Sequence, residues 1–414
     1  LLADKIPNTY PSCNSFYNNT TVSPFHMTEV DEQFVLHQLL SLKTNKAIGL
    51  DKVSARLLKN SAHTITTSVT NLLNLSIRTG TFRNLWKCSK ITALFKSGDR
   101  SNASHYRPIS ILPTLSKILE KAVHSQLYQY LVTNDLLTTK QFGFRKGIST
   151  ESALTNFADE VLLNMEKGKL CGAVFLDLTK AFDTVDHGIL LSRLSAIGLS
   201  GNSLNWFQSY ITKRSQRTCC ESELSSKLPI THGVPQGSIL GPLLLVIYIN
   251  DLPSVPQSSS ASLYADDTVI YCYGSSSREL SEKLNRDLLT VAQWMNEHKL
   301  TLNLEKTKCI LIGSNRKLES KVPLTVSILD HKVDNVSSFK YLGIFISSDF
   351  KWTHHIEYTV KRVNQRLGLL KRVKHLLPLK SRLLYYNSIV MPLFDYADLV
   401  WGDKHNSTLM SSLQ

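Results

Sequence analysis

The pattern of hydrophobic and polar positions divides the chain into helical stretches and short strands in an irregular order. Apolar residues at helical spacing predict helices over about 28–42, 53–77, 115–131, 186–197, 237–249 and 277–298. Runs of β-branched and aromatic residues predict strands over 91–95, 172–178, 308–312, 325–329 and 341–346. The tail, 354–399, has the pattern of two helices broken at Pro378. This order predicts a mixed α+β protein with a helical C-terminal domain.

Two adjacent acidic residues, Asp266 and Asp267, interrupt one of the apolar stretches. Strand-like residues flank them, 261–263 before and 268–273 after. Because consecutive side chains of a strand point to opposite faces, the two carboxylates act together only at a tight turn between two strands. Ionised carboxylates in such a place need a compensating charge, most simply a divalent metal ion. The alternative is a solvated Asp-Asp turn without any ligand.

A third carboxylate, Asp177, closes the apolar strand predicted at 172–178. An uncompensated charge at the end of a buried strand costs several kcal/mol. Helix capping, the alternative for an acidic residue at a strand–helix junction, suits Asp183 or Asp186 better. Asp177 and the Asp266–Asp267 turn therefore have the ingredients of a site for two divalent ions. The carboxylates alone leave open which class of phosphoryl-transfer enzyme this is.

The composition of the chain limits which binding partners and which cellular compartment are compatible with it. The net charge of +14 and the isoelectric point near 9.3 suit a polyanion, nucleic acid first and an anionic membrane surface second. The seven cysteines are scattered and form no CxxC pair, which favours a reducing compartment over a disulfide framework. The longest apolar run, 239–249, is too short to span a membrane. Because the chain begins without methionine, we expect it to be a piece of a longer protein.

Three segments resemble motifs A, B and C of reverse transcriptases, and more narrowly those of non-LTR (LINE-type) retrotransposons. They are FLDLTKAFDTV at 175–185, GVPQGS at 233–238 and YADD at 264–267. Further segments resemble the same family in the same order: 45–51, 96–99, 106–110, 141–147, 303–308 and 341–343. The resemblance extends from about Leu39 to Trp401. Each motif alone is weak evidence, whereas their joint occurrence in order identifies the family.

The resemblance implies a right-hand polymerase, with fingers, a palm whose antiparallel sheet carries the metal site, and a helical thumb. We expect a poorly ordered segment at 1–27, an N-terminal extension and fingers at 28–170, and a palm with interleaved fingers elements at 171–350. A thumb that is cut short at its C-terminal end would occupy 351–414. The implied partners are an RNA template, a DNA primer or target and dNTPs, with no membrane. The implied location is the nucleus, with a cytoplasmic ribonucleoprotein stage.

The implied reaction is attack of a primer 3′-hydroxyl on the α-phosphate of a dNTP. By resemblance, Asp177 and Asp266 bridge two Mg²⁺ ions, with Mn²⁺ as an alternative, and Asp267 adds charge and orientation. Lys306 resembles a general acid for the leaving pyrophosphate, and the nearby Lys308 is the alternative.

Other residues are expected to hold the nucleotide. Lys96 and Arg107 match positions that contact its phosphates, although a solvated loop lysine is the alternative for Lys96. Phe182 matches the position of a ring that would collide with a ribose 2′-hydroxyl and so favour dNTPs, with core packing as its alternative. Gln236 and Gly237 match the turn that approaches nucleotide and template.

Primer and duplex contacts are expected from the last third of the chain. Tyr341, Leu342 and Gly343 resemble the primer grip. A cluster of basic residues with few acidic neighbours suits a phosphate backbone, although it can also be an ordinary solvated face: Lys361, Arg362, Arg366, Lys371, Arg372 and Lys374.

Two alternatives to an active retrotransposon polymerase stay open on the sequence alone. One is a group II intron-type reverse transcriptase, which would carry a maturase region after the thumb. The other is a catalytically inactive remnant that still binds nucleic acid. The intact Asp177, Asp266 and Asp267 count against the remnant.

Overall fold

The computed structural model describes residues 23–221, 223–318 and 322–402, which form two compact units. The first unit holds the described residues up to 138 together with 179–251 and 295–301. The second holds 139–178, 252–294 and the described residues from 302. The segment expected to be poorly ordered, 1–27, lies mostly outside the described residues. The division into fingers, palm and thumb is not the same as these two units and stays a prediction.

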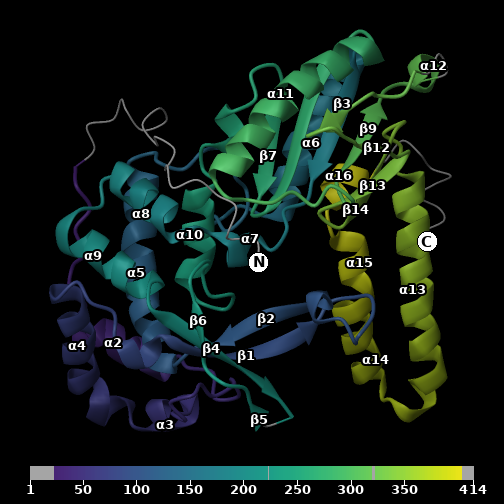
Figure 1. The fold of residues 1–414 in the computed structure, drawn as a ribbon. Coiled ribbons are helices and arrows are strands. Elements are labelled where there is room, and N and C mark those ends of the chain that lie inside the picture. The colour runs from purple at the N-terminus through teal and green to yellow at the C-terminus, as the bar shows by residue number, and fades with distance from the viewer. Residues whose placement is uncertain (1–22, 222, 319–321, 403–414) are drawn as a thin grey trace. The chain divides into compact units, whose positions relative to one another are not determined.

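Helices dominate the first unit (Figure 1). They are α2 (Glu32–Leu40), α3 (Ala55–Asn60), α4 (Ala62–Arg78), α5 (Thr114–Thr133), α7 (Ala181–Thr184), α8 (His187–Ala196), α9 (Gly201–Ile211) and α10 (Leu240–Tyr248). Helix α2 begins later than the helix predicted over 28–42, because Asp31 is its cap: the Asp31 carboxylate accepts a hydrogen bond from the Phe34 backbone N–H at 2.6 Å. The single helix predicted over 53–77 is two helices, α3 and α4, separated at Ser61.

The sheet of the first unit has the order β2-β1-β4-β5, with β6 also paired to β4. Its strands are β1 (Cys88–Phe95), β2 (Tyr106–Ile111), β4 (Arg214–Cys220), β5 (Glu223–Leu224) and β6 (Leu228–Ile230). Strand β1 covers the predicted strand at 91–95, and β2 runs antiparallel to it. Buried aromatic side chains pack edge to face beside this sheet, with Phe82 against Trp206 and Tyr210.

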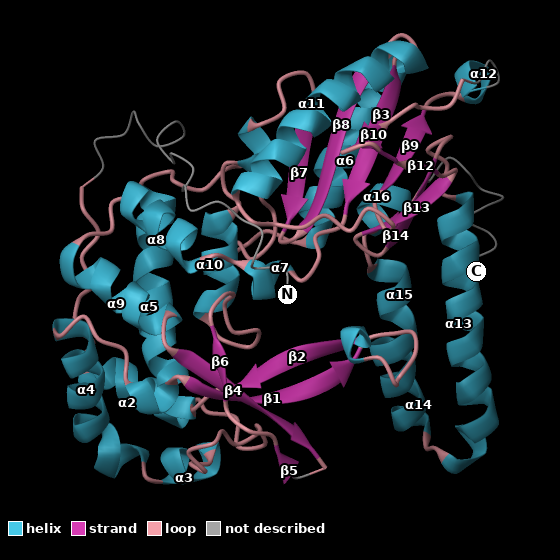
Figure 2. Ribbon diagram, viewed as in Figure 1, coloured by secondary structure: helices cyan, strands magenta, loops and turns pink. Residues whose placement is uncertain are grey.

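The sheet of the second unit has the order β12-β9-β3-β8-β7 (Figure 2). Its strands are β3 (Leu170–Leu176), β7 (Ser260–Tyr264), β8 (Asp267–Gly274), β9 (Lys308–Ile312) and β12 (Asp334–Asn335). Strand β3 is central and runs antiparallel to both β8 and β9. The strand predicted at 308–312 is confirmed, and the strand predicted at 172–178 is present as β3, which begins and ends two residues earlier.

Both faces of β3 are covered, which explains why its sequence is an uninterrupted apolar run. On one face, Phe175 packs against Phe157 of helix α6 (Thr150–Glu166). On the other face, Gly172 lies against Leu280 and Leu284 of helix α11 (Ser277–Glu297). A charged residue is therefore accommodated only at the ends of this strand.

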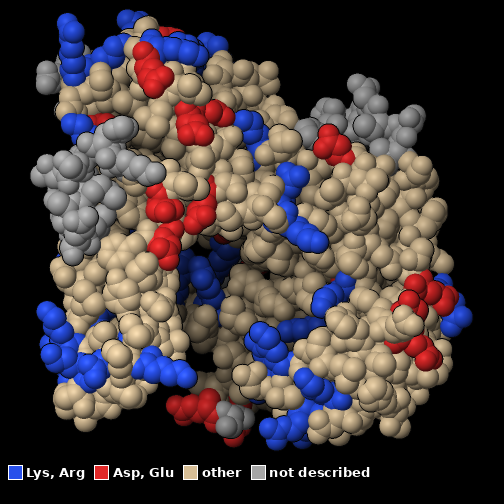
Figure 3. Space-filling view, turned by 180° about the vertical axis from the view of Figure 1, so that it is seen from behind, with Lys and Arg blue, Asp and Glu red and all other residues tan. Residues whose placement is uncertain are grey.

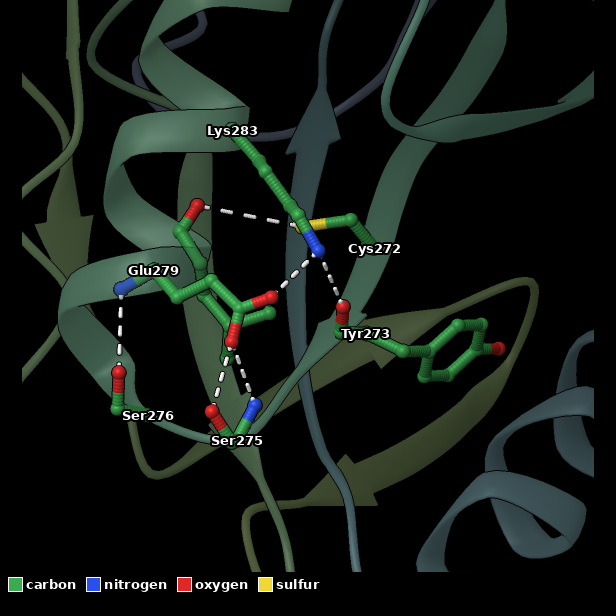
Figure 4. Close-up of polar contacts among 7 residues, drawn as sticks. Cys272, Tyr273, Ser275, Ser276, Glu279 and Lys283 are labelled. Carbon is green, nitrogen blue, oxygen red and sulfur yellow. Dashed lines mark hydrogen bonds and ion pairs between the residues drawn. The ribbon is translucent and has the colours of Figure 1, made fainter.

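The junction of β8 and α11 is tied by charged hydrogen bonds (Figure 4). The Lys283 ammonium donates to the Tyr273 carbonyl at 3.0 Å and to the Glu279 carboxylate at 2.7 Å. The same carboxylate accepts from the backbone N–H and the hydroxyl of Ser275. These bonds, that of Lys283 first, lower the pKa of Glu279 to about 2. They attach α11 to the end of β8 that is remote from Asp267.

The last part of the second unit is a β-hairpin followed by helices. Strands β13 (Ser338–Tyr341) and β14 (Ile344–Ser347) replace the single strand predicted at 341–346, because Leu342 and Gly343 form a turn with positive φ. The helices are α13 (Thr353–Val373), α14 (Leu379–Tyr385), α15 (Met391–Asp395) and α16 (Asp398–Trp401). The predicted break at Pro378 is confirmed, since this proline caps α14. The second unit also contains α12 (Asn315–Leu318) and the pair of strands β10 (Ser327–Ile328) and β11 (His331–Lys332).

A buried histidine, His355, joins α13 to the rest of the second unit. Its Nδ1 accepts a hydrogen bond from the Phe345 backbone N–H at 3.4 Å, and its ring packs edge-on against Trp401. Burial, followed by the nearby cations Lys340, His354 and Arg362, lowers its pKa from 6.5 to about 4. The imidazole is therefore neutral in the folded protein at neutral pH.

This histidine makes stability depend on pH. Between pH 6.5 and about 4 the unfolded chain binds a proton that the folded chain does not, so stability is lost as the pH falls through this window. We expect the free energy of unfolding to drop by up to about 3 kcal/mol from this group. Urea unfolding at pH 7 and pH 4 measures the change. His355→Phe should reduce it, whereas the exposed His354→Gln should not; equal pH dependence in both variants would contradict the prediction.

Candidate active site

Asp266 and Asp267 lie at a two-residue turn between β7 and β8. The last pair of the hairpin is Tyr264 with Asp267, which leaves Ala265 and Asp266 as the turn. Ala265 has a φ of 56°, the positive value that the first position of a type II′ turn requires. The expectation that the two carboxylates lie at a tight turn between strands is confirmed.

The strand register brings Asp177 next to Asp267. The final pair of β3 and β8 is Leu176 with Thr268, so Asp177 and Asp267 follow it directly at the strand ends. Every second residue of a strand points to the same face, so the Asp177 and Asp267 side chains lie on the face that carries Phe175 and Val269. There they line a cavity of about 500 Å³, whose other lining residues include Glu305, Lys306, Lys308, Phe339, Lys340, Tyr341 and Leu342.

Asp266 is placed differently from its two partners, in the turn and not among the residues that line this cavity. Within the described residues, no three His, Cys, Asp or Glu side chains form a group that could hold a metal ion. Asp177 and Asp267 nevertheless supply carboxylate oxygens at one cavity, and oxygen ligands are those that Mg²⁺ prefers. The donor chemistry fits the expected metal, while the complete ligand set stays a prediction.

The structure distinguishes the two candidate lysines. The Lys306 ammonium lies 3.9 Å from a carboxylate oxygen of Asp177. The Lys308 ammonium instead donates a 2.6 Å hydrogen bond to Asp334 on the neighbouring strand β12. Lys306 is thus the lysine that the structure directs toward the carboxylates.

The expected primer grip is the turn between β13 and β14. Tyr341 is only 3% exposed and packs in the core, where burial and then the negative charge of Asp267 raise the pKa of its hydroxyl. Leu342 and Gly343 form the turn itself. The Tyr396 hydroxyl donates to the Leu342 carbonyl at 2.5 Å and so attaches this turn to the segment between α15 and α16. Of the three residues, Tyr341 has the contacts of a core residue.

Lys96 and Arg107 belong to the first unit, on the hairpin of β1 and β2. Arg107 pairs with Leu94, and Lys96 follows two positions after Leu94. Since directly opposed residues share a face and alternate residues share a face, both basic side chains project from the same face of this hairpin. Both are exposed. Two residues with the same expected role are thereby brought together.

The turn that contains Gln236 and Gly237 is docked on β2. The Ser110 N–H donates to the Gln236 carbonyl at 2.6 Å. At Gly237 a Cβ would lie 2.6 Å from the Ser110 carbonyl oxygen, and its φ is +112°, so glycine is required there. Gln236 lines a cavity of about 390 Å³ whose wall also includes Lys180, Asp183 and Arg214.

Phe182 lies beside this turn in α7. Its carbonyl accepts a hydrogen bond from the Val234 N–H at 2.8 Å, which joins the segments of motifs A and B. Its side chain is half-buried and does not line the cavity of Gln236. The structure therefore brings the two segments together and leaves the role of the ring a prediction.

A buried carboxylate, Glu120 of α5, was missed by the sequence-based predictions. It accepts hydrogen bonds from the Ile239 N–H at 2.8 Å and the Tyr210 hydroxyl at 3.2 Å. Burial raises its pKa, although these bonds and the nearby Arg214 oppose the shift. Its carboxylate accepts hydrogen bonds from backbone N–H groups at the start of α10, directly after the Gln236 turn. The sequence did contain a signal for this residue, because it is a single Glu on the apolar face of the helix predicted over 115–131.

The expected duplex-binding residues lie on α13 and directly after it. Five of the six are exposed, and Arg362 is half-buried with its guanidinium over the Tyr358 ring at 5.5 Å. On an α-helix, Lys361 and Arg372 share a face that Lys371 does not share, so the cluster is spread around the helix. On the side of the molecule seen in Figure 3, Lys and Arg form several groups apart from Asp and Glu.

No helix within the described residues is long and apolar enough to cross a membrane.

The chain belongs to the reverse transcriptase (RNA-dependent DNA polymerase) family, which matches residues 96–346, more than half of its length. This match confirms the resemblance of the motifs to those of reverse transcriptases. The chain is 28% identical over 392 residues to the "Probable RNA-directed DNA polymerase from transposon BS" of Drosophila melanogaster. That alignment covers 92% of this chain and 42% of the relative.

A second relative is the RNA-directed DNA polymerase from mobile element jockey of Drosophila melanogaster, 26% identical over 395 residues. This alignment covers 92% of the chain and 43% of the relative. A third, from transposon X-element of the same organism, is 27% identical over 392 residues, with coverages of 92% and 42%. The chain thus spans less than half the length of these curated relatives. All three are named for transposons or mobile elements, in agreement with the predicted non-LTR class.

Proposed function

We propose that this chain is the polymerase part of a non-LTR retrotransposon protein and copies RNA into DNA. The observation that carries the proposal is that Asp177 and Asp267 directly follow the last pair of β3 and β8 and line one cavity together with Lys306. Family membership and the names of the relatives support the same activity. The substrates would be dNTPs, an RNA template and a DNA primer, in the nucleus.

Asp177, Asp266 and Asp267 would hold divalent ions, with Mg²⁺ as the proposed metal and Mn²⁺ as the alternative. When bound, such ions supply charge compensation for the primer oxygen and the leaving pyrophosphate. Asp177 and Asp267 would supply carboxylate oxygens from adjacent positions at the ends of β3 and β8. Lys306, beside Asp177, would donate a proton to the pyrophosphate. Lys96 and Arg107 would bind the phosphates, and Phe182 would exclude a 2′-hydroxyl.

Primer extension tests this proposal. A DNA primer annealed to an RNA template is incubated with folded protein, Mg²⁺ and either dNTPs or rNTPs. We expect extension with dNTPs and little with rNTPs. Absence of extension by soluble, folded protein would contradict the proposal and favour the inactive nucleic-acid-binding remnant.

The two lysines near the carboxylates should differ in their effect on the rate. Loss of a positioned general acid costs on the order of 100-fold or more, so Lys306→Gln should lower the single-turnover rate by about this factor. Lys308→Gln is the matched control, because its ammonium is bound to Asp334, and its rate should stay close to that of the unmodified protein. Equal losses in both variants would contradict a proton-transfer role for Lys306.

A further inference from the structure

The turn that carries Asp266 is held from outside its own hairpin by one buried side chain. Gln141 is fully buried in the second unit. Its side-chain oxygen accepts two backbone hydrogen bonds, from the Ala265 N–H at 2.9 Å and from the Gly143 N–H at 2.7 Å. Its side-chain nitrogen lies 3.4 Å from the Ala265 carbonyl oxygen, within hydrogen-bonding range. One amide group thus contacts both backbone polar groups of the turn residue that precedes Asp266.

The backbone around Gln141 adds to this attachment. The Phe142 N–H donates to the Leu263 carbonyl at 2.8 Å, and the Leu263 N–H donates to the Lys140 carbonyl at 2.9 Å. The segment 140–143 is therefore joined to β7 by a single parallel bridge between Gln141 and Leu263, close to the turn. Its position relative to β7 is fixed independently of the Gln141 side chain.

Close packing at Gly143 completes the contact. A Cβ on this residue would lie 2.2 Å from the Ala265 nitrogen and 2.9 Å from the Tyr264 carbonyl carbon. Both are backbone atoms, so any side chain here would displace the turn. Ala265 itself has a positive φ, a conformation that a non-glycine residue keeps only where its surroundings enforce it.

We propose that Gln141 is a positioning residue that holds the Ala265–Asp266 turn in the conformation required for metal binding by Asp266. This inference rests on the proposed function, because it takes Asp266 to be a metal ligand. Groups that orient metal ligands contribute substantially to metal affinity, although they never touch the ion. Gln141 is suited to this role because its amide is uncharged and adds no negative charge beside three carboxylates.

The decisive variant is Gln141→Met, which keeps the approximate size of the side chain and removes the acceptor. We expect the Mg²⁺ concentration for half-maximal extension to rise by about 10- to 100-fold, the range typical for loss of such an orienting group. The KM for dNTP at saturating Mg²⁺ and the affinity for duplex should remain close to those of the unmodified protein. Gly143→Ala should produce the same change, because its Cβ would displace the backbone of the turn.

Tyr271→Phe is the matched control for lost stability. It removes the part-buried hydrogen bond at 2.9 Å from the Tyr271 hydroxyl, on strand β8 of the same sheet, to Glu160 of helix α6, without touching the turn. Its thermal stability should fall while its Mg²⁺ requirement stays unchanged. If Gln141→Met behaves like Tyr271→Phe in both measurements, Gln141 is only structural and the inference is wrong.

Direct metal binding separates this inference from the proposed function. Mn²⁺ binding is followed by electron paramagnetic resonance, with the protein bound to a template and a primer that ends in a 3′-dideoxynucleotide. We expect weaker Mn²⁺ binding in Gln141→Met and Gly143→Ala than in Tyr271→Phe. An unmodified protein that binds Mn²⁺ but extends no primer would overturn the polymerase proposal alone. Unchanged Mn²⁺ affinity in Gln141→Met would overturn the positioning role alone.

Discussion

Primer extension is expected to fall by at least about 1,000-fold when Asp266 is replaced by asparagine, since several kcal/mol of transition-state stabilisation are lost with the metal. Asparagine has nearly the same size but lacks the negative charge that binds a divalent ion. The turn is held by the pairing of Tyr264 with Asp267 and by contacts of Ala265, which the substitution leaves in place. Binding of an RNA–DNA duplex should therefore be nearly unchanged.

Single-turnover extension and fluorescence anisotropy with a labelled duplex measure the two quantities. Asp330→Asn is the matched control, because Asp330 is an exposed turn residue of the same unit, distant in sequence from the carboxylates. It should extend primers at the unmodified rate. If Asp266→Asn loses duplex binding together with extension, Asp266 is a structural residue and its metal role is wrong.

Incorporation of ribonucleotides is expected to increase by about 100-fold in Phe182→Ala, the upper range for discrimination by the shape of an apolar pocket. The ring at this position would exclude a 2′-hydroxyl, and alanine removes it. The half-buried side chain belongs to α7, whose backbone is held to the Val234 segment by a hydrogen bond. Incorporation of dNTPs should change far less.

The measurement is the ratio of kcat/KM for a dNTP to that for the matching rNTP. Phe182→Tyr retains an aromatic ring of the same size and should keep the discrimination of the unmodified protein. Should Phe182→Ala lower only the melting temperature and leave the ratio unchanged, the ring is a core residue.

Local patterns predicted the elements that carry the carboxylates. Strand β9 has the predicted bounds, and β3 was expected because an apolar run of its length is typical of a strand covered on both faces. Strand β4 was missed, since its residues are mostly polar and partly exposed and its parallel pairing with β1 makes it a strand. Helix α6 was also missed, although Ser149 caps it and Phe157 and Val161 lie at helical spacing, so its signal was present.

The part of the candidate site that lies in the second unit was predicted only in part. The resemblance to reverse transcriptases identified Asp177 and Lys306 as site residues, and the structure brings them to one cavity. The resemblance did not separate Lys306 from Lys308, because the partner of Lys308 lies on a strand far along the chain. It also did not indicate that Tyr341 is a core residue, since an aromatic residue beside a turn suits either role.

By itself, the sequence determined the family, the turn at Asp266 and Asp267, and the three carboxylates as candidates for metal binding. These features can be recognised from the types of residues and from their spacing over short stretches of the chain. Only the tertiary structure decided that Asp267 is the neighbour of Asp177 and that Gln141 holds the turn. Both follow from the register between segments that are distant in the chain, and that register is set by burial and backbone pairing of the whole sheet. No local pattern contains it.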